Sequence, residues 1–232
     1  MEEKIYTIPV NEAFESDDGC PFCRLFKKLE DDEIDLILGA SMMEPDVRIE
    51  TNKKGFCSTH FRKMFVGKNR LGLALILQSH LDTIRKGVET KPSLLVKDAG
   101  ANTAKFIEKL DSTCYICDRI DGKLSKMFET AAILWEKDKS FREKCSSQKY
   151  FCFPHYRRFL SVASGRLSKK DYPEFLKSIN EVEMNYFDKL TGDVAWFCKK
   201  FDYRYDEEPW YNSKDSVMRT EKFLSGDSGW DD

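Results

Sequence analysis

The chain has 232 residues, of which 41% are hydrophobic and 34% charged, and its formal net charge is -2. This length and balance are typical of a globular protein with one large or two small domains, and they exclude a strong overall attraction to nucleic acid or anionic membranes. The N-terminal segment MEEKIYTIPVNEAF is too acidic and polar for a secretory signal, and the longest apolar run, at 71–77, is too short to cross a bilayer. We therefore expect a cytoplasmic protein whose thiols stay reduced.

Four motifs of potential metal ligands follow one another along the chain. The first half carries CPFC and later CSTH, and the second half carries CYIC and later CFPH, with nearly equal gaps between the two motifs of each half. The candidate ligands are Cys20, Cys23, Cys57 and His60 in the first half and Cys114, Cys117, Cys152 and His155 in the second.

Amphipathic helices are predicted around these motifs, roughly three in each half. In each half, apolar residues at helical spacing follow the CxxC, and a polar loop leads to the CxxH. A basic-aromatic helix comes next, FRKMF in the first half and YRRFL in the second. The third helix has apolar stripes at 77–88 and 175–190, and shorter helices are expected at 10–14 and 102–110. No segment shows the alternation typical of a β-strand.

These patterns predict an all-α fold made of two tandem copies of a roughly three-helix module, each stapled by a Cys₃His metal site. The first repeat would span 1–95 and the second 96–205, with a boundary at 91–101, although the two could pack as one domain. A tail at 206–232 would contain a short helix at 215–224 and be partly disordered. Within each repeat, the metal would join the CxxC to the CxxH of that same repeat.

Three thiolates and one imidazole form the ligand set of a closed structural zinc site. Each CxxC is expected just ahead of a helix, where free backbone N–H groups and the helix dipole favour thiolate over thiol. The sequence therefore predicts two zinc ions per chain. Iron is the less favoured metal, because the spacing typical of iron–sulfur clusters is absent.

Catalysis has weaker support in the sequence. The CPFC motif resembles the redox motif of glutaredoxin-type proteins, so a thiol-based redox switch or oxidoreductase is an alternative. However, no buried strand precedes Cys20, and a distant CxxH has no role in a dithiol mechanism. Four ligands per site leave no position for a catalytic water, and HExxH, P-loop, GxSxG and GxGxxG motifs are all absent. The sequence favours a non-catalytic protein without deciding whether it is an enzyme.

The favoured function is an interaction or regulatory scaffold whose partner is another protein, and a homo-oligomer is left open. No membrane contact is expected. A further alternative, which the sequence disfavours, is nucleic-acid binding through the basic helices after each CxxH. Trp210 and Tyr211, beside an acidic turn, fit either an interface or packing of the tail onto the helices.

A few other polar residues carry expectations. His80 is expected in the core or at its boundary with a hydrogen bond, and Cys198 in the core on an extended helical stripe. Cys145 is expected in a polar loop as an exposed free thiol, with a displaced or alternate metal ligand as the less favoured alternative. The carboxylates at 31–33 are expected on a solvated helix face or in a turn.

The motifs also resemble those of a bacterial family whose members carry CPxC, a helix and then a Gly-x-Cys-x-x-His segment. The resemblance covers nearly the whole chain, including the TIPVNEAF start and the PWYNSKDSV segment at 209–217. In the second half, Tyr115 stands where the first has Pro21, and Pro154 where it has Thr59, but the ligands are kept. The family is typical of anaerobic Gram-positive bacteria and has no established activity, so the resemblance implies a bacterial protein without implying a mechanism.

Overall fold

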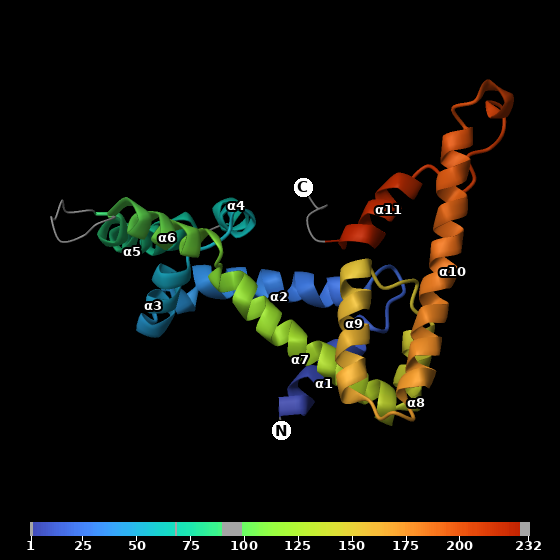
Figure 1. Ribbon diagram of the computed structural model, residues 1–232, viewed down its shortest axis with the longest axis horizontal. Coiled ribbons are helices and arrows are strands. Elements are labelled where there is room, and N and C mark those ends of the chain that lie inside the picture. Colours follow the sequence, from blue (N-terminus) through green and yellow to red (C-terminus); the bar gives the residue numbers. More distant parts are fainter. Residues whose placement is uncertain (1, 68, 90–98, 228–232) are drawn as a thin grey trace. The chain divides into compact units, whose positions relative to one another are not determined.

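The computed structural model of the protein describes residues 2–67, 69–89 and 99–227, and all regular elements within them are helices (Figure 1). The α-helices are α1 (Glu2–Ala13), α2 (Pro21–Leu38), α3 (Pro45–Lys54), α4 (Ser58–Val66), α5 (Arg70–Val88), α6 (Ala99–Asp111), α7 (Tyr115–Lys137), α8 (Lys139–Ser146), α9 (Phe153–Arg166), α10 (Tyr172–Lys199) and α11 (Ser216–Ser225), with 3₁₀ turns η1 (Ala40–Met43) and η2 (Tyr203–Tyr205). The all-α prediction is confirmed for this part of the chain. None of the described helices combines the length and the hydropathy that crossing a bilayer requires.

Each half contains more helices than expected, because α3 and α8 occupy the stretches predicted as polar loops. Local capping explains both. Pro45 opens α3, Asp46 lies in its first turn, and lysines lie in its last turn, where they complement the helix dipole. The Asp138 side chain caps α8 by accepting from the backbone N–H groups of Ser140 and Phe141. The helix predicted at 215–224 is present as α11, whereas most of the boundary at 91–101 and the end of the tail at 228–232 lie outside the described residues.

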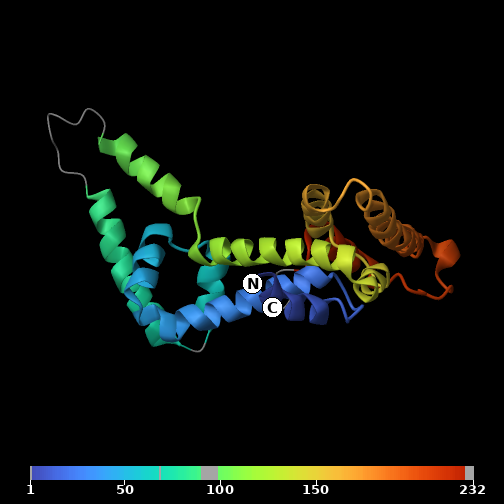
Figure 2. The ribbon, with the colours of Figure 1, turned by 90° about the horizontal axis from the view of Figure 1, so that it is seen from below.

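The chain forms two compact units that differ from the predicted repeats. Unit 1 combines Met1–Lys27 with Leu124–Asp232, and unit 2 is Lys28–Lys123. The chain passes from one unit to the other inside α2 and again inside α7, both of which are continuous helices (Figure 2). Unit 2 is therefore an insertion between the two segments of unit 1, rather than a neighbour of it along the sequence.

Unit 1 has an aromatic core. The rings of Phe22 on α2 and Phe128 on α7 stack with centroids 3.8 Å apart. Around this pair, the fully buried large side chains are Phe14, Trp135, Phe141, Phe151, Phe159, Phe175 and Phe223. Helix α10 packs against α8, α9 and α11, so one long helix holds together the segments on either side of the CFPH motif.

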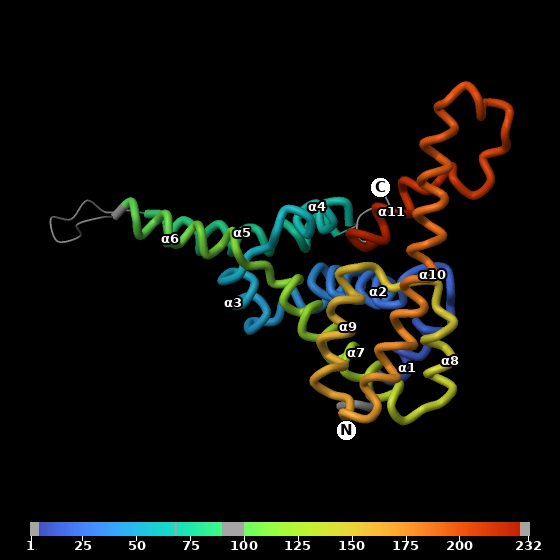
Figure 3. The backbone as a smooth tube through the Cα atoms, turned by 45° about the vertical axis from the view of Figure 1, so that its right-hand side comes forward, coloured from blue at the N-terminus to red at the C-terminus, as the bar shows by residue number. Residues whose placement is uncertain are grey.

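Beyond these contacts, α10 continues into a segment that folds back on its own end (Figure 3). The buried Lys200 ammonium donates to the carbonyl oxygens of Tyr205, Asp206 and Glu208 at 2.6, 2.8 and 2.6 Å and so closes this segment. The Trp210 ring packs on Phe197, with centroids 5.7 Å apart, which confirms packing of the tail onto a helix. Cys198 lies in this last part of α10 and is exposed. The prediction that Cys198 lies in the core is therefore wrong, because α10 extends beyond the helices that pack against it.

Unit 2 is smaller and its core is mainly aliphatic. Helix α3 packs against α5, and α5 also contacts α4 and α6. The buried apolar side chains include Leu29, Ile34, Ile37, Leu38, Met64, Leu73, Ile76, Ile116 and Ile120. His80 on α5 is buried among them, with Nδ1 3.1 Å from the carbonyl oxygen of Asn52, as predicted. Burial lowers the pKa of His80, which keeps its ring neutral.

Two other expectations about polar residues are corrected. Cys145 is fully buried, because α8 forms where a loop was expected and turns this thiol inward. Of the carboxylates at 31–33, Asp31 and Asp32 are exposed, but Glu33 is only 2% exposed. Glu33 accepts from Arg119 at 2.5 Å and also from Lys123, so two cations on α7 compensate its buried charge.

Glu183 on α10 is a buried carboxyl with incomplete hydrogen bonding. Its Oε2 accepts from the backbone N–H of Phe151 at 3.1 Å, whereas Oε1 has no hydrogen-bond partner among the described residues. Burial raises the pKa of Glu183 to about 7. Between the unfolded pKa near 4.5 and this value, the folded state binds the extra proton, so this residue's contribution to stability falls as pH rises.

We predict that Glu183→Gln removes this loss, because the amide keeps an acceptor for Phe151 and carries no charge. The free energy of unfolding of the variant, measured relative to that of the wild type, should rise by about 1–3 kcal/mol when the pH is raised from 5 to 8. Urea unfolding at both pH values measures this. Glu181→Gln, a change at an exposed position two residues away, is the control and should show no such change. Equal pH dependence in both variants would contradict the prediction.

Candidate metal centres

All four ligand motifs occupy the same position, the first turn of a helix. The first ligand of each motif is the residue immediately before α2, α4, α7 or α9, and the second is the third residue inside that helix. The carbonyl oxygen of the first ligand accepts a backbone hydrogen bond from within the turn, as in Phe61 to Cys57 (2.9 Å) and Tyr156 to Cys152 (2.7 Å). Both side chains of a motif therefore project from one turn at the positive end of a helix dipole, where thiolates are stabilised.

The structure brings all eight predicted ligands together in two groups of four. Site 1 comprises Cys20, Cys23, Cys152 and His155, and site 2 comprises Cys57, His60, Cys114 and Cys117. In each group the ligand atoms lie within 4.8 Å of one another, and all the cysteines are free thiols. The predicted grouping was wrong: each CxxC meets the CxxH of the other half, rather than that of its own half.

At site 2, backbone contacts explain this exchange. The N–H of Tyr115 donates to the carbonyl oxygen of Gly55 at 3.0 Å, and the Thr113 hydroxyl donates to that of Lys54 at 2.7 Å. Gly55 has φ +62°, and a Cβ there would approach Nε2 of His80 to 3.1 Å, so this tight turn requires glycine. These contacts hold the turn before Cys57 against the turn before Cys114.

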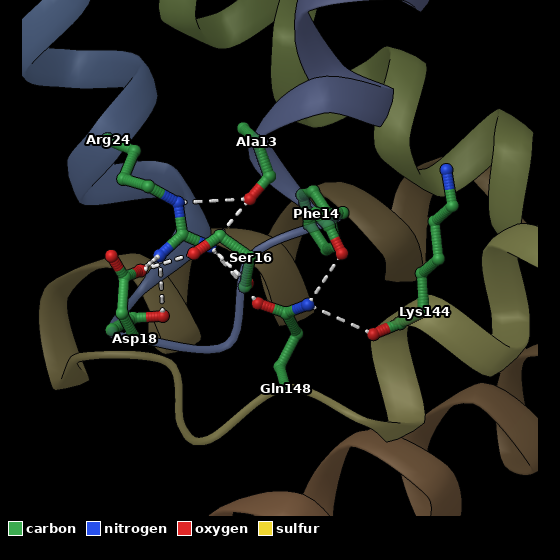
Figure 4. Close-up of polar contacts among 8 residues, drawn as sticks. Ala13, Phe14, Ser16, Asp18, Arg24, Lys144 and Gln148 are labelled. Carbon is green, nitrogen blue, oxygen red and sulfur yellow. Dashed lines mark hydrogen bonds and ion pairs between the residues drawn. The ribbon is translucent and has the colours of Figure 1, made fainter.

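At site 1, the aromatic core and a polar network act together. The Arg24 guanidinium fixes the loop before Cys20 by donating to Asp18 and to the carbonyl oxygens of Ala13, Ser16 and Gly19 (Figure 4). Gln148, in the loop before Cys152, accepts from Arg24 at 3.4 Å and donates to the carbonyl oxygen of Phe14 at 2.8 Å. The two loops that carry the ligands are thus bonded to each other.

The distances from each histidine Nδ1 to the three sulfurs of its group, and one S···S distance in each group, are close to the edges of a tetrahedron around zinc. For Zn–S bonds of about 2.3 Å and Zn–N bonds of about 2.0 Å, tetrahedral geometry requires S···S near 3.8 Å and S···N near 3.5 Å. At site 1 the Cys23–Cys152 Sγ atoms are 3.5 Å apart, and the three Sγ atoms lie 3.1–3.7 Å from Nδ1 of His155. At site 2 the Cys57–Cys117 Sγ atoms are 3.8 Å apart, and Nδ1 of His60 lies 3.2–3.4 Å from the three Sγ atoms.

The electrostatics of both groups also favour a cation. At site 1, hydrogen bonds from Cys152 and Cys20 hold the pKa of Cys23 far below its usual range, while burial and hydrogen bonds with Cys152 and Cys23 raise the pKa of Cys20. At site 2, although burial opposes it, the hydrogen bond with His60 lowers the pKa of Cys114 to about 6. Burial and the adjacent Cys114 raise the pKa of Cys117. One thiolate thus hinders formation of the next, and a divalent cation between the sulfurs removes that repulsion.

Glu30 on α2 is a site residue that sequence reasoning missed. Its Oε1 lies 3.2 Å from Nε2 of His60, and its Oε2 accepts from the Lys63 ammonium at 2.6 Å. Although burial opposes ionisation, the adjacent His60 ring and the hydrogen bond from Lys63 lower the pKa of Glu30. A carboxylate behind the ring orients a metal-bound histidine and increases its basicity. The available signal was an acidic residue next to Leu29 on the apolar face of the helix, where a buried charge requires a partner.

Comparison with known proteins agrees with the resemblance in the motifs. A model described as a family of unknown function (DUF6062) matches residues 1–230. Comparison with curated proteins gives no match, and comparison with solved structures gives none either.

We predict that Glu30→Gln weakens zinc binding at site 2 by roughly ten- to a hundredfold, because the amide orients His60 without increasing its basicity. A Cys152→Ser background disables site 1, so titration with a chelator of known affinity would report site 2 alone. Glu33→Gln is the matched control, since Glu33 is equally buried on the same helix but pairs with Arg119 and Lys123. Equal zinc affinities in the two variants would refute the role of Glu30.

Proposed function

The chain belongs to this family of unknown function, and from its two ligand groups we propose that it is a zinc-binding helical scaffold with two structural Cys₃His sites. The observation that carries the proposal is the pair of four-ligand groups with tetrahedral spacing, each at the meeting point of two helix N-termini. Both sites use four protein ligands, so neither keeps an open position for a substrate or water. Zinc fits this mixed sulfur and nitrogen set without redox chemistry, whereas iron–sulfur clusters favour cysteine alone.

The metals contribute to stability by closing long loops. Site 1 joins residues 20–23 to residues 152–155, and site 2 joins 57–60 to 114–117. Fixing such distant segments restricts the unfolded chain, and metal binding then becomes part of the folding free energy. The ligands must remain thiolates, so the proposal places the protein in a reducing compartment such as the cytoplasm.

An internal duplication explains the order of the elements. Helices α1–α5 and α6–α10 occupy equivalent positions around the four motifs, so the proposed repeat has five helices rather than three. In this interpretation the two copies exchange partners at the metals. The exchange makes each site depend on both copies, which supports one interdependent scaffold over two autonomous modules.

The proposed partner is another protein, and the end of α10 supports this. Phe201, Tyr203 and Tyr211 are 75%, 86% and 71% exposed there, on a segment closed by Lys200. Exposed aromatic side chains on a fixed support are typical of protein interfaces. Nucleic-acid binding through the helices after each CxxH has less support, because Lys63 pairs with Glu30 and the Arg158 guanidinium lies over the Phe128 ring.

Metal content in double variants tests the zinc sites and their grouping together. The wild type should contain two zinc ions per chain, and Cys57→Ser or Cys152→Ser should each lose one. The double variant Cys20→Ser/Cys152→Ser removes two ligands of site 1 and should retain one zinc. Cys20→Ser/Cys57→Ser damages both sites and should retain none. Mass spectrometry of the purified proteins provides the count. The reverse outcome for the two doubles would indicate grouping within each half, and wild-type protein without zinc would refute the proposal.

Replacing Phe201 and Tyr203 together by serine should abolish capture of the partner from the native cell without changing helicity or zinc content. Leu81→Ser is the control, because Leu81 is 62% exposed on α5, which belongs to unit 2. Chemical cross-linking followed by affinity purification compares the three proteins. If the same proteins co-purify with all of them, the end of α10 is not the contact surface.

A further inference from the structure

The two sites differ in how the chain covers their sulfurs. At site 1, the turn after α11 lies over the ligands. The backbone N–H of Asp227 donates to Sγ of Cys23 at 3.4 Å. A Cβ on Gly226, which has φ +91°, would lie 3.6 Å from Sγ of Cys152 and 3.8 Å from that of Cys23. The Asp227 carboxylate pairs with Lys222 at 2.6 Å, which ties the turn to its helix.

Site 2 has one sulfur open to solvent. Cys114 and His60 are buried and Cys57 is half-buried, but Cys117 is exposed. The contacts of the Cys117 sulfur within the described residues are with its fellow ligands, Sγ of Cys57 at 3.8 Å and Nδ1 of His60 at 3.4 Å. A solvent oxidant can therefore reach Cys117, whereas the α11 turn shields the site 1 sulfurs.

From this difference in solvent exposure we propose that site 2 is an oxidant-sensitive metal site whose Cys117 thiolate reacts with hydrogen peroxide, while site 1 keeps its metal under the same conditions. The proposal rests on the proposed function, since it requires both sites to hold zinc. Among thiolates, exposure and electron density at sulfur decide which is oxidised. At Cys23, which is half-buried, the hydrogen bond from Asp227 and partial cover by the turn reduce both.

The chemistry requires two steps and one molecule of peroxide. The Cys117 thiolate attacks a peroxide oxygen, the O–O bond breaks, and Cys117 becomes a sulfenic acid as hydroxide departs. The Cys57 thiolate then attacks the Cys117 sulfur, forms the S–S bond and expels a second hydroxide. Two sulfurs lose two electrons in total, the peroxide gains two, and protons from the solvent convert both hydroxides into water. Zinc loses two of its four ligands and is released.

Loss of this zinc frees His60 and Cys114 from the metal, while the new disulfide still joins the first turn of α4 to that of α7. Unit 2 has the smaller, aliphatic core, so its helices should loosen while unit 1 keeps its own metal and its aromatic core. Because a thiol reductant and zinc together reverse both steps, the result is a switch confined to one unit.

The experiment uses full-length protein with two bound zinc ions and Cys198→Ser, which removes the other exposed thiol. Hydrogen peroxide is added and released zinc is followed with a chromogenic chelator. One zinc per chain should leave at least about tenfold faster than the other, with a disulfide between Cys57 and Cys117 in the peptide map. In the Cys198→Ser background, the Cys152→Ser variant should retain only the rapidly released zinc of site 2. The Cys57→Ser variant should retain only the slowly released zinc of site 1. Truncation after Ser225, which removes the covering turn, should make both zinc ions fast.

Equal release rates, or early oxidation of Cys20, Cys23 or Cys152 in the two-zinc protein, would overturn the proposal. Peptide mapping of this protein needs no ligand variant, so the test remains decisive even if a variant fails to fold. Failure of the proposed function has a different signature, because zinc would then be missing before any peroxide is added.

Discussion

The fold depends on the first turn of four helices, each of which presents two ligands in one direction. A residue ahead of the helix and the third residue inside it emerge on the same side of the turn, next to unpaired backbone N–H groups. Two such turns facing each other supply four ligands and two positive dipole ends. The local structure therefore prepares half of each site before tertiary packing brings the halves together.

Packing then decides which turns meet. The stacked Phe22 and Phe128 rings and the Arg24–Gln148 contact bring the first CxxC to the second CxxH. The Gly55–Tyr115 contact brings the other two motifs together. Because the partners belong to opposite halves of the chain, neither half can complete a site alone. Glu30 adds a further dependence, since α2 contributes cysteines to site 1 and a carboxylate to the histidine of site 2.

The sequence identified the helical class and all eight residues that gather in the two groups, because both follow from local spacing. It did not identify the grouping, since the two halves have nearly equal gaps and the choice depends on contacts such as Tyr115 to Gly55. Cys145 and Cys198 were misplaced for related reasons. A capped helix turned the first inward, and the second lies where α10 extends beyond its neighbours. The place of Glu30 on the apolar face of its helix indicated a buried carboxylate, but its partner His60 became evident only in the structure.

The nesting of unit 2 within unit 1 sets an order for assembly during synthesis. All four ligands of site 2 lie in the continuous segment Lys28–Lys123, so this unit can close as soon as that segment has left the ribosome. Cys20 and Cys23 are synthesised first of all the ligands, yet they must wait for His155 to complete their site and for Asp227 to cover it. Under the proposed zinc binding, Cys20 and Cys23 are thus the last thiols to be protected although they are synthesised before the other ligands, and the nascent protein must keep them reduced until then.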